Sequence, residues 1–456
     1  MKSRKVVSWD KGKIFRKENV KEKRMKKTVS FMLVFAVSVS LVSTFLVGSV
    51  SGAENITLRF WATASSTRDR GRRIIWQNFE KENPGVKVDF EGIPWDKFTE
   101  KVLTSSVTGT LPDGVRYGFV ARFASKGLVM PLDEFIEGPN GIDPSQYLEG
   151  VFPNPSITWN GEIYALPHAW GMYPAVAYNR DILKEVGVDP PTTWKEIRAV
   201  AKKLTKKASD GEVIRYGMQM SGYNMVINGF VGTNGGTFTD VVGQGATKAT
   251  YSAPENVEGF QFLADMVKDG YLLVLRGELE AKNFIEGKAA MWFLGSSDAS
   301  RIRPEIYPEL NWGITRCPVP EGKPIVVPAG YHDAAYMFKS TKYPELAWKL
   351  LKAYSWKEGN SLVWIHKFGS MPPFKDVLDE NTLNGYYYPF QVESHLRKIM
   401  EIAINYPSIA RGPDRWHLQG SEIQNLELGQ YDLILAGEKS VKEGLEYLDR
   451  KVGALL

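Results

Sequence analysis

Strand-like and helix-like segments alternate from Ile56 onward, and this alternation constrains the fold more than any other feature of the sequence. Ile56–Trp61 and Val86–Phe90 are rich in β-branched and aromatic residues, whereas Arg68–Lys81 spaces its apolar residues on one helical face. A second helical spacing starts at Trp95 and is followed by a short strand-like segment, residues 114–117. Strands that alternate with helices of this length predict an α/β fold with a mostly parallel sheet.

The segment YALPHAWGMYPAVAYNRD, residues 164–181, carries large aromatic side chains where a regular helix is excluded. Pro167, Gly171 and Pro174 lie too close together for uninterrupted helical hydrogen bonding, so the backbone there is extended or turning. Trp170 and its aromatic neighbours therefore either belong to the core or line the floor of a cleft.

Local signals predict turns and helix starts further along the chain. Asn160-Gly161 is the preferred pair for a tight hairpin turn. The glycine-rich segment GFVGTNGGTF, residues 229–238, lacks the spacing of a nucleotide-binding loop and is predicted to be a loop. Capping boxes predict helices from about 194 to 207, from 254 to 268 and near the C-terminus; they pair Thr193 with Glu196, Ser252 with Glu255 and Ser440 with Glu443.

Residues 1–53 differ from the rest and predict an N-terminal extension with a signal peptide. They hold 12 basic and 3 acidic residues, and a charge-free segment, residues 28–50, precedes the small residues Ser51 and Ala53. This is the pattern of a cleaved secretory signal, with an uncleaved membrane anchor as the alternative. Because secretory signals begin with a short basic region, we expect translation to start at Met25.

The remaining 45 basic and 49 acidic residues make the body mildly acidic, which argues against a nucleic-acid partner. Cys317 is the only cysteine, so it forms no disulfide within the chain, and no thiol lies at the cleavage site for a lipid anchor. We therefore expect a periplasmic or extracellular protein that is not lipid-anchored, with Cys317 buried.

No sequence motif for catalysis, for a cofactor or for a metal is present. The five histidines are scattered, and neither a nucleophile elbow nor a P-loop occurs. The sequence does not exclude a pair of catalytic carboxylates, because the distance between two carboxylates is a property of the folded chain. The chain is instead rich in aromatic residues, with 13 Trp, 20 Tyr and 22 Phe, and several tryptophans lie beside polar or turn residues. Such side chains stack on the apolar faces of sugar rings while polar neighbours bond the hydroxyls.

Five segments resemble the extracellular solute-binding proteins of ABC sugar importers, the family that contains maltose-binding protein. The most specific is residues 160–197, NGEIYALPHAWGMYPAVAYNRDILKEVGVDPPTTWKEI, which matches YN-D, G and PP-TW-E of the family skeleton in order. The others are LRFWATASS (58–66), the segment after LPD (111–135), FIEGKAAMWFLGSS (284–297), and WGITRCPVPEGKP with the segment that follows it (312–324 and 329–354). Together they span most of the chain after the signal peptide.

The resemblance implies a two-lobe α/β periplasmic-binding-protein fold of type II, with a hinge that crosses more than once and a ligand cleft between the lobes. Lobe 1 would be residues 54–172 plus 320–362, and lobe 2 residues 173–319 plus 363–456. Residues 167–179 would form the first crossing, with Trp170 on the cleft floor. The resemblance also implies which residues contact ligand: Trp61, Ser65, Ser66, Tyr117, Trp170, Tyr223, Asn224, Ser296, Ser297, Asp298 and Trp416.

The implied function is capture of a sugar or short oligosaccharide and delivery to the membrane permease subunits of an ABC importer. Such a protein is not an enzyme, needs no cofactor or metal, and is expected to be a monomer. Serines replace charged residues of maltose-binding protein in the first loop, so the chain departs from the maltose pattern. Two alternatives stay open: a polyol or glycerol phosphoester as ligand, for which Arg122 and Arg411 are available, or a secreted carbohydrate-active hydrolase.

Overall fold

The computed structural model describes most of the chain after residue 54. The described residues are 55–64, 68–118, 120–172, 175–295, 298–302, 306–357, 372–378, 398, 401–402, 405–406, 408–409 and 417–456. Within these ranges no helix combines the length and the apolar character that a membrane span requires.

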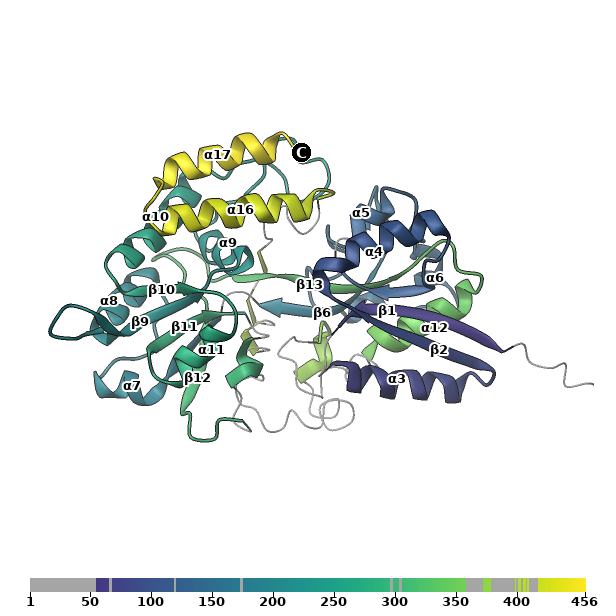
Figure 1. The fold of residues 1–456 in the computed structure, drawn as a ribbon, viewed down its shortest axis with the longest axis horizontal. Helices are drawn as coiled ribbons and strands as arrows, with labels where there is room; N and C mark the ends of the chain where they lie inside the picture. Colours follow the sequence, from purple (N-terminus) through teal and green to yellow (C-terminus); the bar gives the residue numbers. More distant parts are fainter. Residues whose placement is uncertain are drawn as a thin grey trace, which may run out of the picture. The chain divides into compact units, whose positions relative to one another are not determined.

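The first sheet contains the strands that the N-terminal alternation predicted (Figure 1). Its order is β14-β13-β3-β1-β2, with β6 paired to β13, and β1 runs parallel to both β2 and β3. β13 is antiparallel to β3 and to β6. The strands are β1 (Ile56–Thr63), β2 (Val86–Ile93), β3 (Gly114–Arg116), β6 (Leu166–Met172), β13 (Val327–Met337) and β14 (Ser408–Ile409).

Helices cover both faces of this sheet because side chains along β1 alternate between the faces. Phe60 packs with α3 and α12 in one buried cluster, whereas Trp61 packs with α4 and α5 in another. A hairpin follows, and Asn160 at φ 49° and Gly161 at φ 86° turn it as predicted. The bounds are α3 (Arg68–Glu82), α4 (Trp95–Thr108), α5 (Val120–Ala124), α6 (Asp133–Glu137), η2 (Pro144–Gln146), β4 (Thr158–Trp159), β5 (Glu162–Ile163) and α12 (Pro344–Ser355).

The second sheet has the order β10-β9-β11-β7-β12, with the short β8 beside β9. β9 is parallel to β10 and β11, whereas β7 is antiparallel to β11 and β12, so this sheet is mixed. The strands are β7 (Ala175–Asn179), β8 (Lys206–Lys207), β9 (Val213–Ser221), β10 (Leu272–Leu275), β11 (Ala289–Leu294) and β12 (Trp312–Arg316).

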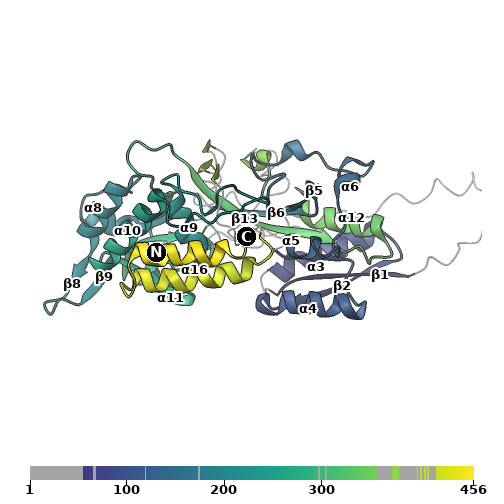
Figure 2. The same cartoon turned by 90° about the horizontal axis from the view of Figure 1, so that it is seen from above.

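Helices of the second sheet enclose a large apolar core, in which α16 and α17 lie side by side (Figures 1 and 2). Cys317 is buried within this core as expected, and burial raises the pKa of its thiol. The bounds are α7 (Arg180–Glu185), α8 (Trp194–Leu204), α9 (Asn224–Gly232), α10 (Pro254–Lys268), α11 (Glu278–Ile285), η3 (Asp298–Ile302), η4 (Lys375–Leu378), α16 (Gly420–Leu435) and α17 (Val441–Gly453).

Two of the three predicted capping boxes are confirmed, at the starts of α8 and α17. The third is wrong, because Ala253 is the cap residue of α10 and the Ser252 hydroxyl instead donates to Asp449 on α17. Helix α8 ends at Leu204, three residues earlier than predicted, where the short strand β8 begins to pair with β9.

The glycine-rich segment was also predicted wrongly in its first part. Residues 229–232 form the last turn of α9 and are buried, whereas Gly235 at φ 92° lies in the loop that follows. The helix forms despite its glycines because its apolar residues pack into the core.

Strand direction determines where the chain passes between the sheets. β6 is parallel to β1, β2 and β3, so it leaves the first sheet at the edge where those strands end. Only two residues separate it from β7, whose first residue, Ala175, pairs with Leu294 at the carboxyl end of β11. The return passage joins the end of β12 to the start of β13 at the same two edges. The carboxyl ends of β1–β3 and of β9–β11 therefore both adjoin the crossing segments.

We predict opposite effects of alanine at two glycines. A Cβ on Gly217 of β9 would lie 1.9 Å from the Ala201 carbonyl oxygen of α8, whereas a Cβ on Gly429, exposed within α16, would meet nothing within 4 Å. Gly217→Ala should lower the free energy of unfolding by at least about 2 kcal/mol. Gly429→Ala should raise it by about 0.5–1 kcal/mol, because alanine loses less entropy in a helix. Urea unfolding measures both, and equal effects would contradict the close packing of β9 on α8.

Candidate functional site

An aromatic cluster lies where β2 and β3 of the first sheet end. Trp95 begins α4 directly after β2, and its ring lies 4.7 Å from that of Tyr117, centroid to centroid. Tyr117 stacks at 4.2 Å on Phe98 and its hydroxyl lies 3.1 Å from that of Thr99. Tyr117 is 2% exposed, whereas Trp95 is 38% exposed, so Trp95 offers the aromatic surface at this edge.

Trp61, another predicted site residue, lies on the neighbouring strand β1 and is 6% exposed. The Lys101 ammonium lies 4.6 Å from its ring centroid, which is a cation–π contact. Lys101 also pairs with Glu91 of β2. Trp61 and Tyr117 belong to the same buried cluster, so the structure brings these two predicted residues together.

Tyr223 occupies the corresponding edge of the second sheet, after β9. It is the cap residue of α9 and is 41% exposed. Burial raises the pKa of its hydroxyl, and the nearby carboxylates of Glu280 and Asp298 act in the same direction. The structure therefore places Tyr223 and Asp298, both predicted from sequence, within one electrostatic environment.

Asn224, the next predicted residue, is fully buried in a polar network between α9 and α16. Its amide nitrogen donates to Glu427 of α16, and its amide oxygen accepts from Gln424 at 3.2 Å. Glu427 also accepts from Asn228 at 3.1 Å and from the Tyr251 hydroxyl at 2.7 Å. The side chain of Asn224 thus joins α9 to α16.

Charged groups lie near Gly295 and Asp298, which follow β11. The Gly295 amide donates to Asp298 at 3.0 Å. The Arg301 guanidinium lies 3.7 Å from Asp298 and 3.6 Å from Glu280 of α11. Glu280 is 1% exposed and accepts a 2.6 Å hydrogen bond from Ser221. Burial raises the pKa of Glu280 to about 7 and Asp298 adds to the shift, whereas Ser221 and Arg301 oppose it.

Several predicted site residues lie outside the described residues. They are Ser65, Ser66, Ser296, Ser297 and Trp416, together with Arg411, which was a possible phosphate ligand. Trp170 lies in β6, where its backbone pairs with His332 of β13, but its side chain is not described.

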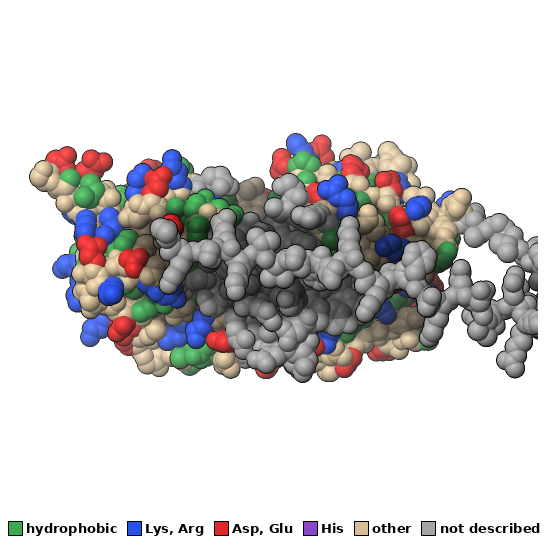
Figure 3. Space-filling view, turned by 90° about the horizontal axis from the view of Figure 1, so that it is seen from below, with side chains coloured by type: hydrophobic (Ala, Val, Ile, Leu, Met, Phe, Trp, Pro, Cys, Tyr) green, Lys and Arg blue, Asp and Glu red, His purple; other side chains and the backbone are tan. Residues whose placement is uncertain are grey.

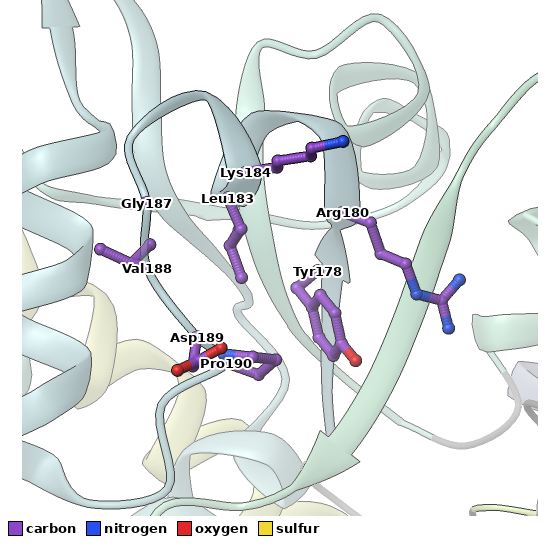
Figure 4. Close-up of a pocket in the computed structure, with 8 residues that line it drawn as sticks. All are labelled: Tyr178, Arg180, Leu183, Lys184, Gly187, Val188, Asp189 and Pro190. Carbon is purple, nitrogen blue, oxygen red and sulfur yellow. The ribbon is translucent and has the colours of Figure 1, made fainter.

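A pocket of about 430 Å³ lies elsewhere in the second sheet region (Figure 4). Tyr178, Leu183 and Val188 line it, and the Arg180 guanidinium points away from Val188. Tyr178 pairs with Met291 near the start of β11, whereas the candidate residues follow the end of that strand. The pocket is therefore at the opposite edge of the sheet from Tyr223 and Asp298.

On the face drawn in Figure 3, the charges of the described residues are mixed, because basic and acidic side chains are interspersed. Among the described residues, no group of three or more His, Cys, Asp or Glu side chains is arranged to hold a metal ion.

A family model described as bacterial extracellular solute-binding protein matches residues 64–360 of the chain. The chain belongs to this family. The solute-binding protein is 29% identical over 320 residues to a binding protein of Brucella abortus, covering 68% of this chain and 73% of that one. It is 27% identical over 349 residues to the sn-glycerol-3-phosphate-binding periplasmic protein UgpB of Escherichia coli K12, covering 73% and 77%.

Solved structures confirm the two-lobe α/β fold. The sugar-binding protein MalE of Xanthomonas citri superposes with a TM-score of 0.72 at 21% identity, covering 88% of this chain and 97% of that one. The substrate-binding protein Lmo0181 of Listeria monocytogenes, solved with cycloalternan, gives 0.71 at 19% identity, with coverage of 88% and 98%. The predicted fold class and family are therefore correct.

Sequence reasoning missed Trp95, Glu280 and Arg301 as residues of this region. The signal for Trp95 was present, because GIPWDK places a tryptophan between a strand and a helix, beside polar residues. Glu280 and Arg301 gave no such signal, since only the folded chain brings them together.

The raised pKa of Glu280 predicts a specific pH dependence of stability. The folded chain holds this proton up to about pH 7, whereas the unfolded chain releases it near the ordinary value of 4.5. The contribution of Glu280 to stability therefore falls as pH rises from 4.5 to 7 and is constant above 7. Glu280→Gln removes this contribution, so its melting temperature relative to the unchanged protein should increase from pH 5 to pH 8. A difference independent of pH would contradict the burial of an ionisable Glu280.

Proposed function

We propose that this protein captures a sugar or short oligosaccharide outside the cytoplasm and delivers it to the permease subunits of an ABC importer. The observation that carries the proposal is the exposed ring of Trp95 at the carboxyl edge of the first sheet, with Tyr223 at the carboxyl edge of the second. In open α/β sheets, ligands bind outside the carboxyl ends of the strands. Aromatic faces at that position suit the apolar faces of sugar rings.

The binding movement would be closure of two lobes on the ligand. We place lobe 1 at residues 54–172 plus 320–362 and lobe 2 at 173–319 plus 363–456, apart from β14, which pairs with β13 in the first sheet. This division is supported by the chain passing between the sheets after β6 and after β12. It is also supported by α12 packing in the core of the first sheet and α17 in the core of the second. Hinge closure is an established movement of periplasmic binding proteins.

Within the cleft, we assign direct ligand contacts to Trp95 and to the residues predicted from sequence, except the buried Trp61, Tyr117 and Asn224. Tyr117 would support the ring of Trp95, and Trp61 would act through the buried cluster that it shares with Tyr117. Asn224 would act indirectly by holding Tyr223 through the network around Glu427. Trp416 would stack on the sugar from the C-terminal region, and Ser65, Ser66, Ser296 and Ser297 would bond its hydroxyls.

A glycerol phosphoester is the second candidate ligand, because the chain is similar to UgpB. A phosphate in the cleft requires arginine side chains or backbone amides as donors. Three described arginines already have partners. Arg122 donates to the Leu418 carbonyl at 2.9 Å, Arg276 pairs with Asp432, and Arg301 donates to the Gly277 carbonyl at 2.7 Å. The carboxylates beside Arg276 and Arg301 offset the charge of these two guanidinium groups, which favours a neutral, hydroxyl-rich ligand.

We further propose that the protein is exported by a signal peptide within residues 1–53, acts as a monomer, and neither turns over its ligand nor requires a cofactor or metal. The family consists of solute-binding proteins, which supports binding without catalysis. A hydrolase would require two carboxylates flanking the bound glycoside.

A thermal-shift screen of residues 54–456 tests the proposal. Compounds that bind only the folded state raise the melting temperature by mass action. We expect a sugar such as maltotriose to raise it, with the sugar recovered unchanged. If sn-glycerol 3-phosphate alone raised the melting temperature, the ligand would be a glycerol phosphoester instead of a sugar. Recovery of cleaved sugar would establish a hydrolase.

Replacement of Trp95 tests the aromatic platform. Trp95→Ala should weaken binding of the sugar found in the screen by about 1–3 kcal/mol, as should Trp416→Ala, because each removes a stacking surface. Isothermal titration measures the affinity. Ile214→Ala is the control, since Ile214 is 56% exposed at the amino end of β9, away from the site. Unchanged affinity in Trp95→Ala would remove Trp95 from the site.

A further inference from the structure

Glu280 is a buried acidic residue whose position is set by an unusual backbone conformation. Gly277 precedes α11 at φ 82° and ψ −150°, a conformation that side chains strongly disfavour. The helix then starts so that Glu280 lies in its first turn, 1% exposed, against Ser221 at the end of β9. One carboxylate oxygen, Oε1, has no hydrogen-bond partner in the part of the chain that the structure describes.

A buried carboxylate with an unpaired oxygen lowers stability, and an apolar or amide side chain of similar size would avoid that cost. Buried groups that lower stability in this way are expected at functional positions of folded proteins. The neighbours of Glu280 indicate what its function is, because they connect three segments that follow strands of the second sheet.

Arg301 makes this connection from η3. Its Nη2 donates to the Gly277 carbonyl at 2.7 Å, and its Nη1 lies 3.6 Å from Glu280 and 3.7 Å from Asp298. Its guanidinium also lies 5.8 Å from the ring centroid of Trp292 in β11. The charged and titratable groups that face Glu280 are thus Arg301 and Asp298 from η3 and Tyr223 from the loop after β9.

We infer that Glu280 is a positioning residue, which acts through Arg301 to hold Asp298 in the arrangement that binds ligand. This inference rests on the proposed function, which assigns Asp298 a contact with the ligand. When Glu280 is ionised it attracts the Arg301 guanidinium, which in turn orients Asp298 and the Gly295 amide bonded to it. When Glu280 is protonated this attraction is lost, and Arg301 and Asp298 are held less firmly.

The first test is the pH profile of maltotriose affinity, measured by isothermal titration. In the unchanged protein the affinity should increase about fivefold from pH 6 to pH 8, the order of one partly screened ion pair. Glu280→Gln should bind about fivefold more weakly at pH 8 and show no such increase. Glu286→Gln is the matched control, since Glu286 ends the same helix at an exposed position and pairs with Lys288. An identical pH profile in Glu280→Gln and the unchanged protein would overturn the inference.

The second test needs no ligand. Trypsin at pH 8 should cleave after Arg301 faster in Glu280→Gln than in the unchanged protein or in Glu286→Gln, because Arg301 loses one of its partners. Mass spectrometry identifies the cleaved bond. If the unchanged protein does not bind maltotriose, the proposed ligand is wrong, but the cleavage rates still decide the role of Glu280. Equal rates in all three proteins would show that Glu280 does not hold Arg301.

Discussion

The backbone pairing of β6 with β13, and of β7 with β11 and β12, is the constraint on which the site depends. Because only two residues separate β6 from β7, the strand that ends in one sheet is followed at once by the strand that begins in the other. Because of these strand directions, the carboxyl edge of each sheet lies next to the segments that cross between the two sheets. Residues distant in sequence, such as Trp95 and Tyr223, are thereby placed at the edges where ligands of open α/β sheets bind.

Buried polar groups in the second half of the structure hold the segments that approach this edge. Glu427 accepts hydrogen bonds from Asn224, Asn228 and Tyr251, and these contacts satisfy a carboxylate that burial would otherwise make unfavourable. Glu280 is less completely satisfied, because one of its oxygens lacks a partner among the described residues. The contacts of Glu427 make its surroundings rigid. The pKa of Glu280 lies near neutrality, so the contacts of Glu280 are sensitive to pH.

Features determined by neighbouring residues could be predicted from the sequence. The Asn160-Gly161 turn and the capping boxes at Thr193 and Ser440 depend on a few adjacent residues, and they appear as expected. The Ser252 cap failed because Asp449, far along the chain, bonds the same hydroxyl. The two-lobe fold was predicted from the family resemblance, because local residue spacing does not determine how strands are arranged in sheets.

The site was less predictable, because exposure and pairing arise only in the folded chain. Tyr117 and Trp95 differ little as sequence signals, yet one is buried and the other offers its ring to solvent. Asn224 lies in a segment that the family resemblance assigned to ligand, and its amide is bonded within the protein. Glu280 lies on a helix beside exposed residues, and nothing in its sequence neighbourhood indicates that it is buried against Ser221.

If the two carboxyl edges form one ligand site, a bound sugar contacts both. Hydrogen–deuterium exchange of residues 54–456, with and without saturating maltotriose, tests it most directly. We expect the sugar to slow exchange at both edges, in the segments around residues 93–98 and 220–224. Protection at one edge alone, or around the pocket at Tyr178, would contradict a shared site.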